Sequence, residues 1–138
     1  MQLGFYENKK LIQTKEYDGL TSDILLNILK DVINNYKIEK FIYTSGPGSH
    51  MATKITYITL KTINILKDID FSAISAFELN NSKPIKALGK LYFIKEKDTI
   101  ITKRFDTTIK SSFFMPKSLD NLSLLEKLEP DYQISAIN

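Results

Sequence analysis

Cysteine is absent from the 138 residues, and histidine occurs only once, as His50. These two absences exclude thiol catalysis, disulfide bonds and every zinc site built from cysteines or from several histidines. A Ser-His-Asp triad would have to use His50. Carboxylates, lysines, tyrosines and hydroxyl groups are therefore the side chains left for chemistry.

Arginine is almost as scarce, because Arg104 is the only one among 19 basic side chains. Lysine, isoleucine and asparagine are abundant, as AT-rich coding produces, so the net charge of +3 says little about nucleic acid. The lysines are scattered along the sequence, and the eight Phe and seven Tyr form no basic-aromatic stripe. We therefore expect no tight, direct RNA binding by this chain alone.

Long apolar runs are also missing, so no transmembrane helix and no signal peptide is predicted. The length fits one ordinary domain, which buries roughly 70% of its unfolded surface. Hydrophobic residues make up 43% and charged residues 25%, close to the average of soluble proteins. These values predict a cytoplasmic protein with no membrane partner.

The first 76 residues alternate between strand-like and helix-like patterns. Residues 50–66 are ambiguous, because many are β-branched, but 17 residues without Gly or Pro favour a helix over a strand. Thr21 or Ser22 can cap the first helix. The predicted strands are 2–6, 10–16, 40–44 and 69–75, and the predicted helices are 20–36 and 50–66. This order predicts an α/β fold with a mixed sheet flanked by helices.

The second part of the chain is less regular. Residues 78–86 are polar and contain Pro84, which predicts a boundary between a domain at 1–77 and a smaller lobe at 78–138. Within that lobe we expect a hairpin at 90–95 and 99–105, then an irregular connector at 111–118. A short helix at 119–128 and an extended tail from Pro130 complete the prediction.

The most distinctive segment is Ser45-Gly46-Pro47-Gly48-Ser49, which joins a predicted strand to a predicted helix. Glycines and helix-terminal amides could bind an anion there. The alternative, which the pattern favours, is a tight turn in which both glycines are structural and Ser49 caps the helix. The segment is not a P-loop, because no Lys-Ser or Lys-Thr follows Gly48. His50 is interpreted as a surface residue of the first helical turn rather than a ligand contact.

Asp68 and Asp70 flank the entry to the strand at 69–75. Paired carboxylates can bind a metal or exchange protons, but at such a place they more often end a helix and solvate a loop. No arrangement of residues therefore predicts catalysis or a metal site.

The two predicted helices carry more apolar residues than packing on one sheet requires. In helix 20–36 they fill an arc of roughly 200°, whereas a stripe of about 100° is enough. The excess predicts docking on another protein. Leu60, Ile63 and Tyr57 lie outside the main apolar face of helix 50–66, and which positions face the sheet stays open. The candidate interface residues are Ile24, Ile28 and Val32 from one helix and Met51, Ile55, Ile58 and Thr62 from the other.

From the strand at 40–44 onward, the sequence resembles the TsaB (YeaZ) family. That family follows a strand with Gly-Pro-Gly-Ser-Phe-Thr-Gly, an apolar residue, Arg and then Ile or Leu. The segment 46–49 matches the first four residues, Lys54 and Ile55 stand where the Arg and its neighbour stand, and residues 50–53 have diverged. The tail from Leu128 to Tyr132 resembles the family's proline-tyrosine ending. The resemblance covers residues 1–77 and extends loosely over the rest.

The resemblance implies an actin-like ATPase (ASKHA, RNase H-like) half-domain with a reduced C-terminal part. It implies a non-catalytic subunit for making threonylcarbamoyladenosine on tRNA, paired with the catalytic subunit TsaD and aided by the ATPase TsaE. The helices matching 20–36 and 50–66 form the partner interface in that family. A homodimer of the isolated chain, indirect contact with tRNA, and ATP only in partner subunits are further implications.

The sequence also departs from the family. Relatives usually begin with a strand carrying Asp-Thr-Ser or Asp-Thr-Thr, whereas this sequence begins at what would be the second strand, and its second half is short. Both departures predict no nucleotide site within this chain. Two alternatives remain open: a nucleotide-binding or hydrolase-type enzyme that uses the 45–49 loop, and a self-associating adaptor unrelated to tRNA.

Overall fold

The chain forms a mixed α/β structure, seen in a computed structural model that describes residues 1–110 and 112–131. No helix in these two ranges is long and apolar enough to cross a membrane. The elements in chain order are β1 (Gln2–Glu7), β2 (Lys10–Glu16), α1 (Thr21–Asn35), β3 (Lys40–Thr44), α2 (His50–Lys67), β4 (Asp70–Ile74), the 3-10 helix η1 (Ala76–Leu79), β5 (Ile85–Leu88), β6 (Leu91–Glu96) and β7 (Thr99–Arg104).

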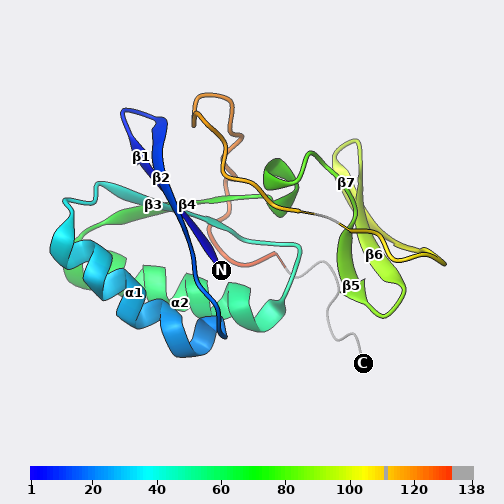
Figure 1. Cartoon of the computed structure of the whole chain (residues 1–138), viewed down its shortest axis with the longest axis horizontal. Coiled ribbons are helices and arrows are strands. Elements are labelled where there is room, and N and C mark those ends of the chain that lie inside the picture. Colours follow the sequence, from blue (N-terminus) through cyan, green and yellow to red (C-terminus); the bar gives the residue numbers. More distant parts are fainter. Residues whose placement is uncertain (111, 132–138) are drawn as a thin grey trace.

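The first body places strands over two helices. Strands β3 and β4 run parallel, with Lys40 opposite Asp70 and Thr44 opposite Ile74, and α2 makes the crossover between them. Both helices lie on the same side of these strands (Figure 1). Their inward side chains meet those of the strands in one core cluster: Leu25, Leu29, Tyr43, Leu60, Ile63, Phe71 and Ala73.

The strands of this body form two separate sheets rather than the predicted single mixed sheet. Strand β1 pairs only with β2, and β3 only with β4, among the described residues. In Figure 1 the β1–β2 hairpin runs steeply across the direction of β3 and β4. A hydrogen-bonded ladder needs neighbouring strands that are nearly aligned, so this crossing prevents one continuous sheet.

The two helices begin differently. Ser49 caps α2 as predicted, because its Oγ accepts a hydrogen bond from the amide of Ala52 at 3.3 Å. The prediction that Thr21 or Ser22 caps α1 is wrong. Leu20 occupies that cap position and offers no side-chain oxygen, so only its carbonyl accepts the amides of Asp23 and Ile24. Helix α1 therefore begins without the side-chain bond that α2 has.

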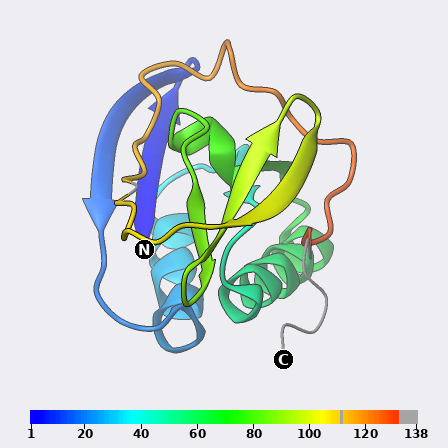
Figure 2. The same cartoon turned by 90° about the vertical axis from the view of Figure 1, so that its right-hand side faces the viewer.

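A second lobe is built on the antiparallel sheet β5–β6–β7. The hairpin β6–β7 confirms the prediction for residues 90–105, but β5 was not predicted and begins inside the boundary segment expected at 78–86. Pro84 stands directly before β5, where its missing amide costs no ladder bond. Figure 2 shows this sheet in front of the first body. Its inner face packs on η1, in a small core of Ala76, Phe77, Ile85 and Phe93.

Residues 112–131 return to the first body in an irregular, extended path, and the predicted helix at 119–128 is wrong. Ser118 pairs with Lys10, and Leu124 pairs with Ile74. The amide of Leu125 donates to the carbonyl of Ala73 at 2.8 Å. The free edges of β2 and β4 therefore form hydrogen bonds with backbone groups of this segment. In a helix those groups would bond to one another.

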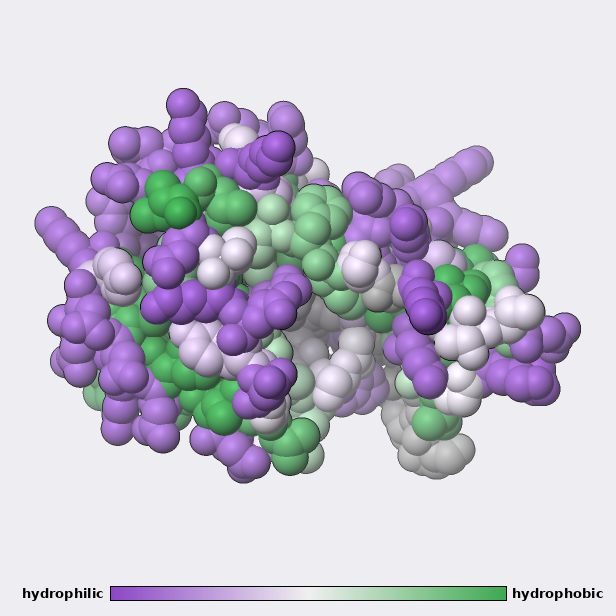
Figure 3. Space-filling view, in the orientation of Figure 1, coloured by the Kyte–Doolittle hydropathy of each residue, from purple (hydrophilic) through white to green (hydrophobic). Residues whose placement is uncertain are grey.

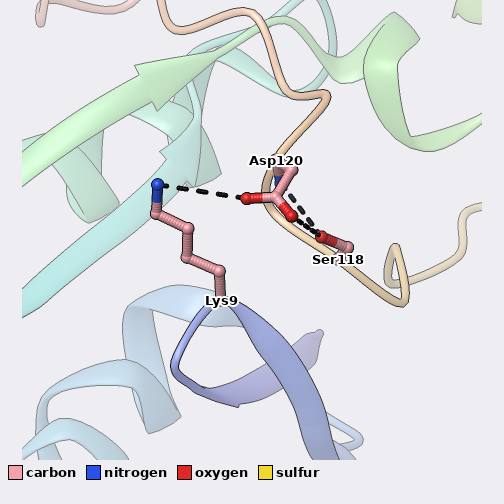
Figure 4. Close-up of polar contacts among 3 residues, drawn as sticks. All are labelled: Lys9, Ser118 and Asp120. Carbon is pink, nitrogen blue, oxygen red and sulfur yellow. Dashed lines mark hydrogen bonds and ion pairs between the residues drawn. The ribbon is translucent and has the colours of Figure 1, made fainter.

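Within this segment, a turn at residues 118–120 is held by polar side-chain contacts (Figure 4). The hydroxyl of Ser118 donates to Oδ2 of Asp120 at 3.0 Å and accepts the amide of Asp120 at 3.1 Å. Lys9 Nζ lies 3.9 Å from Oδ1 of the same carboxylate. The Asp120 amide is thus satisfied by the Ser118 side chain, and the Leu119 amide donates to the carbonyl of Lys9 at 2.9 Å. Both bonds compete with helix formation.

Candidate functional site

The loop from Ser45 to Ser49 connects the end of β3 to the start of α2. Its first part is buried, because Ser45, Gly46 and Pro47 are covered, while Ser49 is exposed. The amide of Ser45 donates to the carbonyl of Ile74 at 3.0 Å, and the carbonyl of Gly46 accepts the amide of Ala76 at 2.9 Å. These hydrogen bonds connect the loop to the end of β4. The backbone groups of the loop that form them therefore stabilise the fold.

Gly46 is the glycine that the turn requires. Its φ is +129°, a conformation that residues with a side chain rarely adopt, and the peptide to Pro47 is cis. A Cβ on Gly46 would lie 2.8 Å from the carbonyl oxygen of Asp131. A phosphate would need to approach the backbone closely on this side of Gly46. The carbonyl of Asp131 already occupies that space.

Gly48 does not have the structural role that we expected. Its φ is not positive, and nothing lies within 4 Å of a Cβ placed on it. The expectation that both glycines are structural is thus confirmed for Gly46 and wrong for Gly48. His50, the first residue of α2, is half-buried.

The carboxylates beside β4 also serve the local backbone. Asp68 ends α2 in the left-handed conformation, with φ of +57°, and its amide donates to the carbonyl of Asn64. Oδ1 of Asp70 accepts a long 3.4 Å hydrogen bond from the side chain of Asn64. This arrangement is that of a helix end.

Helix α2 has a sharply divided surface. Leu60 and Ile63, which lie off the predicted interface face, are buried in the core. On the opposite side Met51 is 67% exposed, Ile58 50% and Ile65 71%. At about 100° per residue these three and the exposed Thr62 fall within an arc of roughly 60°. We call this set the α2 stripe: Met51, Ile58, Thr62 and Ile65.

The threonines of α2 explain how a β-branched segment forms a helix and keeps an apolar surface. The hydroxyl of Thr62 donates to the carbonyl of Ile58 at 2.8 Å, and Thr53, Thr56 and Thr59 each donate in the same way to the carbonyl four residues earlier. Each hydroxyl is satisfied within the helix. The side chain of Thr62 therefore does not need an outside partner for its hydroxyl, and the α2 stripe is apolar in effect.

The other predicted interface residues are more enclosed. Val32 is only 7% exposed and lies among the inward residues of α1. The prediction that Val32 belongs to the contact surface is therefore wrong. Ile55 is half-buried and packs against the core. Ile24 and Ile28 are half-buried on the flank of α1, whereas Leu26, which we did not select, is 54% exposed.

On the face shown in Figure 3, apolar residues reach the surface over the two helices, between hydrophilic ones. Helices α1 and α2 pack side by side, so their outer sides form one continuous surface. An apolar stripe on paired helices is suited to binding another protein. Neither a scan against protein-family models nor a search of curated proteins finds a match to this chain.

Proposed function

We propose that the chain is a non-catalytic partner subunit in the modification of tRNA to threonylcarbamoyladenosine. In this role its two helices dock on a TsaD-like catalytic subunit. A TsaE-like ATPase acts through the assembled complex, and ATP is bound by those partner subunits. The fold proposed with it is an actin-like half-domain with a reduced second lobe.

The order of elements supports this proposal. A hairpin, a helix, a strand, the Gly-Pro-Gly-Ser loop, a second helix and a parallel strand follow one another as the resemblance to TsaB implies. The segment that resembles the family's ending also lies beside the Gly-Pro-Gly-Ser loop, where Leu128 and Asp131 are hydrogen-bonded to Tyr43 and Ser45.

The α2 stripe is the observation that carries the proposal. Its apolar side chains remain exposed in the isolated chain, and each such side chain contributes about 1.5–3 kcal/mol when fully buried. Covering it with a partner helix is therefore favourable. In the absence of TsaD the same stripe would pair two copies of this chain.

The test is size-exclusion chromatography with light scattering on the chain alone and mixed with its cognate TsaD. We expect a homodimer that TsaD converts into a heterodimer. Ile58→Asp and Ile65→Asp should abolish both associations without unfolding the chain, because a charge would be buried without a partner. Ile12→Asp is the matched control, since Ile12 is 60% exposed but lies on β2.

The proposal also predicts a cellular effect. Nucleosides from tRNA of cells that carry Ile58→Asp should contain less threonylcarbamoyladenosine than those of cells that carry Ile12→Asp. Helix variants that stay paired would place the interface elsewhere. A chain that is monomeric at high concentration and does not bind TsaD would overturn the proposed function.

A further inference from the structure

The register of the second lobe brings together lysines that are distant in the sequence. Lys86 on β5 and Lys103 on β7 both stand directly opposite Tyr92 on β6. Directly opposite residues share one face of a sheet, so the two lysines flank Tyr92 on the same face. They stand two strand spacings apart, about 10 Å. Ile85 and Phe93 of the other face pack on η1. On this face Tyr92 is buried, and its hydroxyl accepts the amide of Ile109 at 3.1 Å, whereas Lys86 and Lys103 beside it are exposed.

An aromatic ring lies beside one of these cations. Phe105 packs edge-on against Tyr92, with ring centroids 5.5 Å apart and planes at 85°. The Lys103 ammonium lies 5.5 Å from the centroid of the Phe105 ring, and the amide of Phe105 donates to the carbonyl of Lys90 at 3.0 Å. Phe105 is half-buried. We call Lys86, Lys90, Lys103 and Phe105 the basic-aromatic face.

The lobe around this face concentrates the positive charge of the chain. Residues 83–110 contain eight basic and three acidic side chains, a net charge of +5. The remaining residues contain eleven basic and thirteen acidic side chains, a net charge of −2. Within the described part of the chain, none of the lobe's cations has a carboxylate within ion-pair distance, since the ion pair present joins Lys9 and Asp120. The lobe thus presents uncompensated cations to a partner.

We propose that the basic-aromatic face binds single-stranded RNA. The lysines would contact phosphates, and the Phe105 ring would stack an unpaired base, which is how such surfaces hold single strands. An anionic lipid surface fits less well, because membrane-binding surfaces add large exposed apolar side chains. Ile101, an apolar residue on this face, is only 39% exposed. An acidic protein would make no use of the stacking ring.

This inference does not rest on the proposed docking of TsaD, because the α2 stripe belongs to the other body of the chain. It also changes what the sequence alone predicts, since the lysines appear scattered until strand pairing aligns them. The two proposals can therefore fail independently, and the variants that test one leave the other surface intact.

The experiment is fluorescence anisotropy of the full chain with a labelled 12-nucleotide oligouridine RNA between 50 and 300 mM salt. We expect binding whose log K falls with log salt at about −0.7 per phosphate contacted. The triple variant Lys86→Gln, Lys90→Gln, Lys103→Gln should weaken binding at least tenfold and make that slope shallower by about 2. Phe105→Leu should weaken binding at 300 mM salt, where stacking contributes the larger share.

The matched control is Lys30→Gln, Lys37→Gln, Lys40→Gln, which removes the same charge from exposed positions of the first body, away from the α2 stripe. It should retain the wild-type affinity. Equal loss in both triple variants would overturn the proposal, because the attraction would then come from net charge alone. Absence of binding at 50 mM salt, or preference for phosphatidylserine vesicles over RNA, would also overturn it. Thermal melting of each variant separates lost contacts from lost folding.

Discussion

The backbone amide of Asp131 donates a 2.7 Å hydrogen bond to the carbonyl of Ser45, which brings the Asp131 carbonyl against the α-carbon of Gly46. The hydroxyl of Tyr43 donates to the carbonyl of Leu128 in the same region. Residues 128–131 are thereby fixed to the loop at residues 45–49. The loop and residues 128–131 pack as one unit, so substitutions in the loop should change the stability of the chain.

Gly46→Ala should destabilise the chain, and Gly48→Ala should not. At Gly46 a side chain meets both a φ of +129° and the Asp131 carbonyl, which together should cost on the order of 1–3 kcal/mol or more. At Gly48 the space is open and φ is ordinary, so Ala should stabilise by about 0.4–1 kcal/mol by restricting the unfolded chain. Urea unfolding of both variants measures the difference. Equal effects would contradict this account of the loop.

The second prediction concerns how residues at the N-terminal caps of the two helices affect stability. Ser49→Ala removes the acceptor of the Ala52 amide and should cost about 0.5–2 kcal/mol. Leu20→Asp adds a cap acceptor to α1 where none exists, and it should stabilise by about 1 kcal/mol. Thr21→Ala is the control and should change little, because Thr21 lies inside α1 and caps nothing. A large loss from Thr21→Ala would show that α1 begins differently in solution.

Much of the first body could be predicted from the sequence, because its signals are local. Apolar periodicity predicted α1, a long run without Gly or Pro predicted α2, and short apolar runs predicted β1 to β4. The segment at 119–128 has leucines at helical spacing and was predicted as a helix. The prediction failed because Ser118 and Asp120 form a local turn and the edge of β4 offers a carbonyl to Leu125. Only the tertiary structure provides that edge.

The candidate surfaces also divide into a part that local sequence signals predict and a part that depends on tertiary structure. The helical spacing grouped Met51, Ile58 and Thr62, which do share an exposed side of α2. It could not tell that Val32 turns inward, because the apolar arc of α1 is about 200° wide. The basic-aromatic face could not be predicted at all. Lys86 and Lys103 are 17 positions apart, and their alignment depends on β5, a strand hidden by its short length and the preceding Pro84.

The hairpin turn at Asn8 and Lys9 provides a third prediction. Both residues have positive φ, 52° and 66°, which is the geometry of a type I′ turn that favours Asn-Gly. Lys9→Gly should therefore stabilise by about 0.5–1 kcal/mol, even though it removes the ion pair with Asp120. That pair is 3.9 Å long and its side chains are 71% and 66% exposed, so it contributes little.

Lys9→Gly changes both the backbone strain and the ion pair with Asp120, and Lys9→Ala separates these two effects. It removes the ion pair but keeps the strained φ, so stability should change by less than about 0.5 kcal/mol. Urea unfolding at low and high salt checks both variants. A loss of stability in Lys9→Ala that disappears at high salt would mean that the Lys9–Asp120 pair holds the 118–120 turn more strongly than its geometry indicates.

The final prediction concerns Tyr6, whose hydroxyl donates to the carbonyl of Pro116 at 2.6 Å. Burial raises the pKa of Tyr6 above its usual value of 10.0. In the window between 10.0 and the raised pKa, the folded chain keeps the Tyr6 proton while the unfolded chain loses it. The free energy of unfolding should therefore fall as pH rises through this window, and the contribution of Tyr6 is fully present below pH 10.

Tyr6→Phe isolates this effect from the lysines that titrate in the same range. The variant should be less stable near neutral pH by about 0.5–1.5 kcal/mol, because the bond to Pro116 is lost. Between pH 9.5 and 11 the free energy of unfolding of the variant should also fall less than that of the wild type. The two plots of this free energy against pH should therefore converge. Urea unfolding across that range measures both. Parallel curves would mean that Tyr6 titrates alike in the folded and unfolded chains, and that the segment at 112–116 does not cover it in solution.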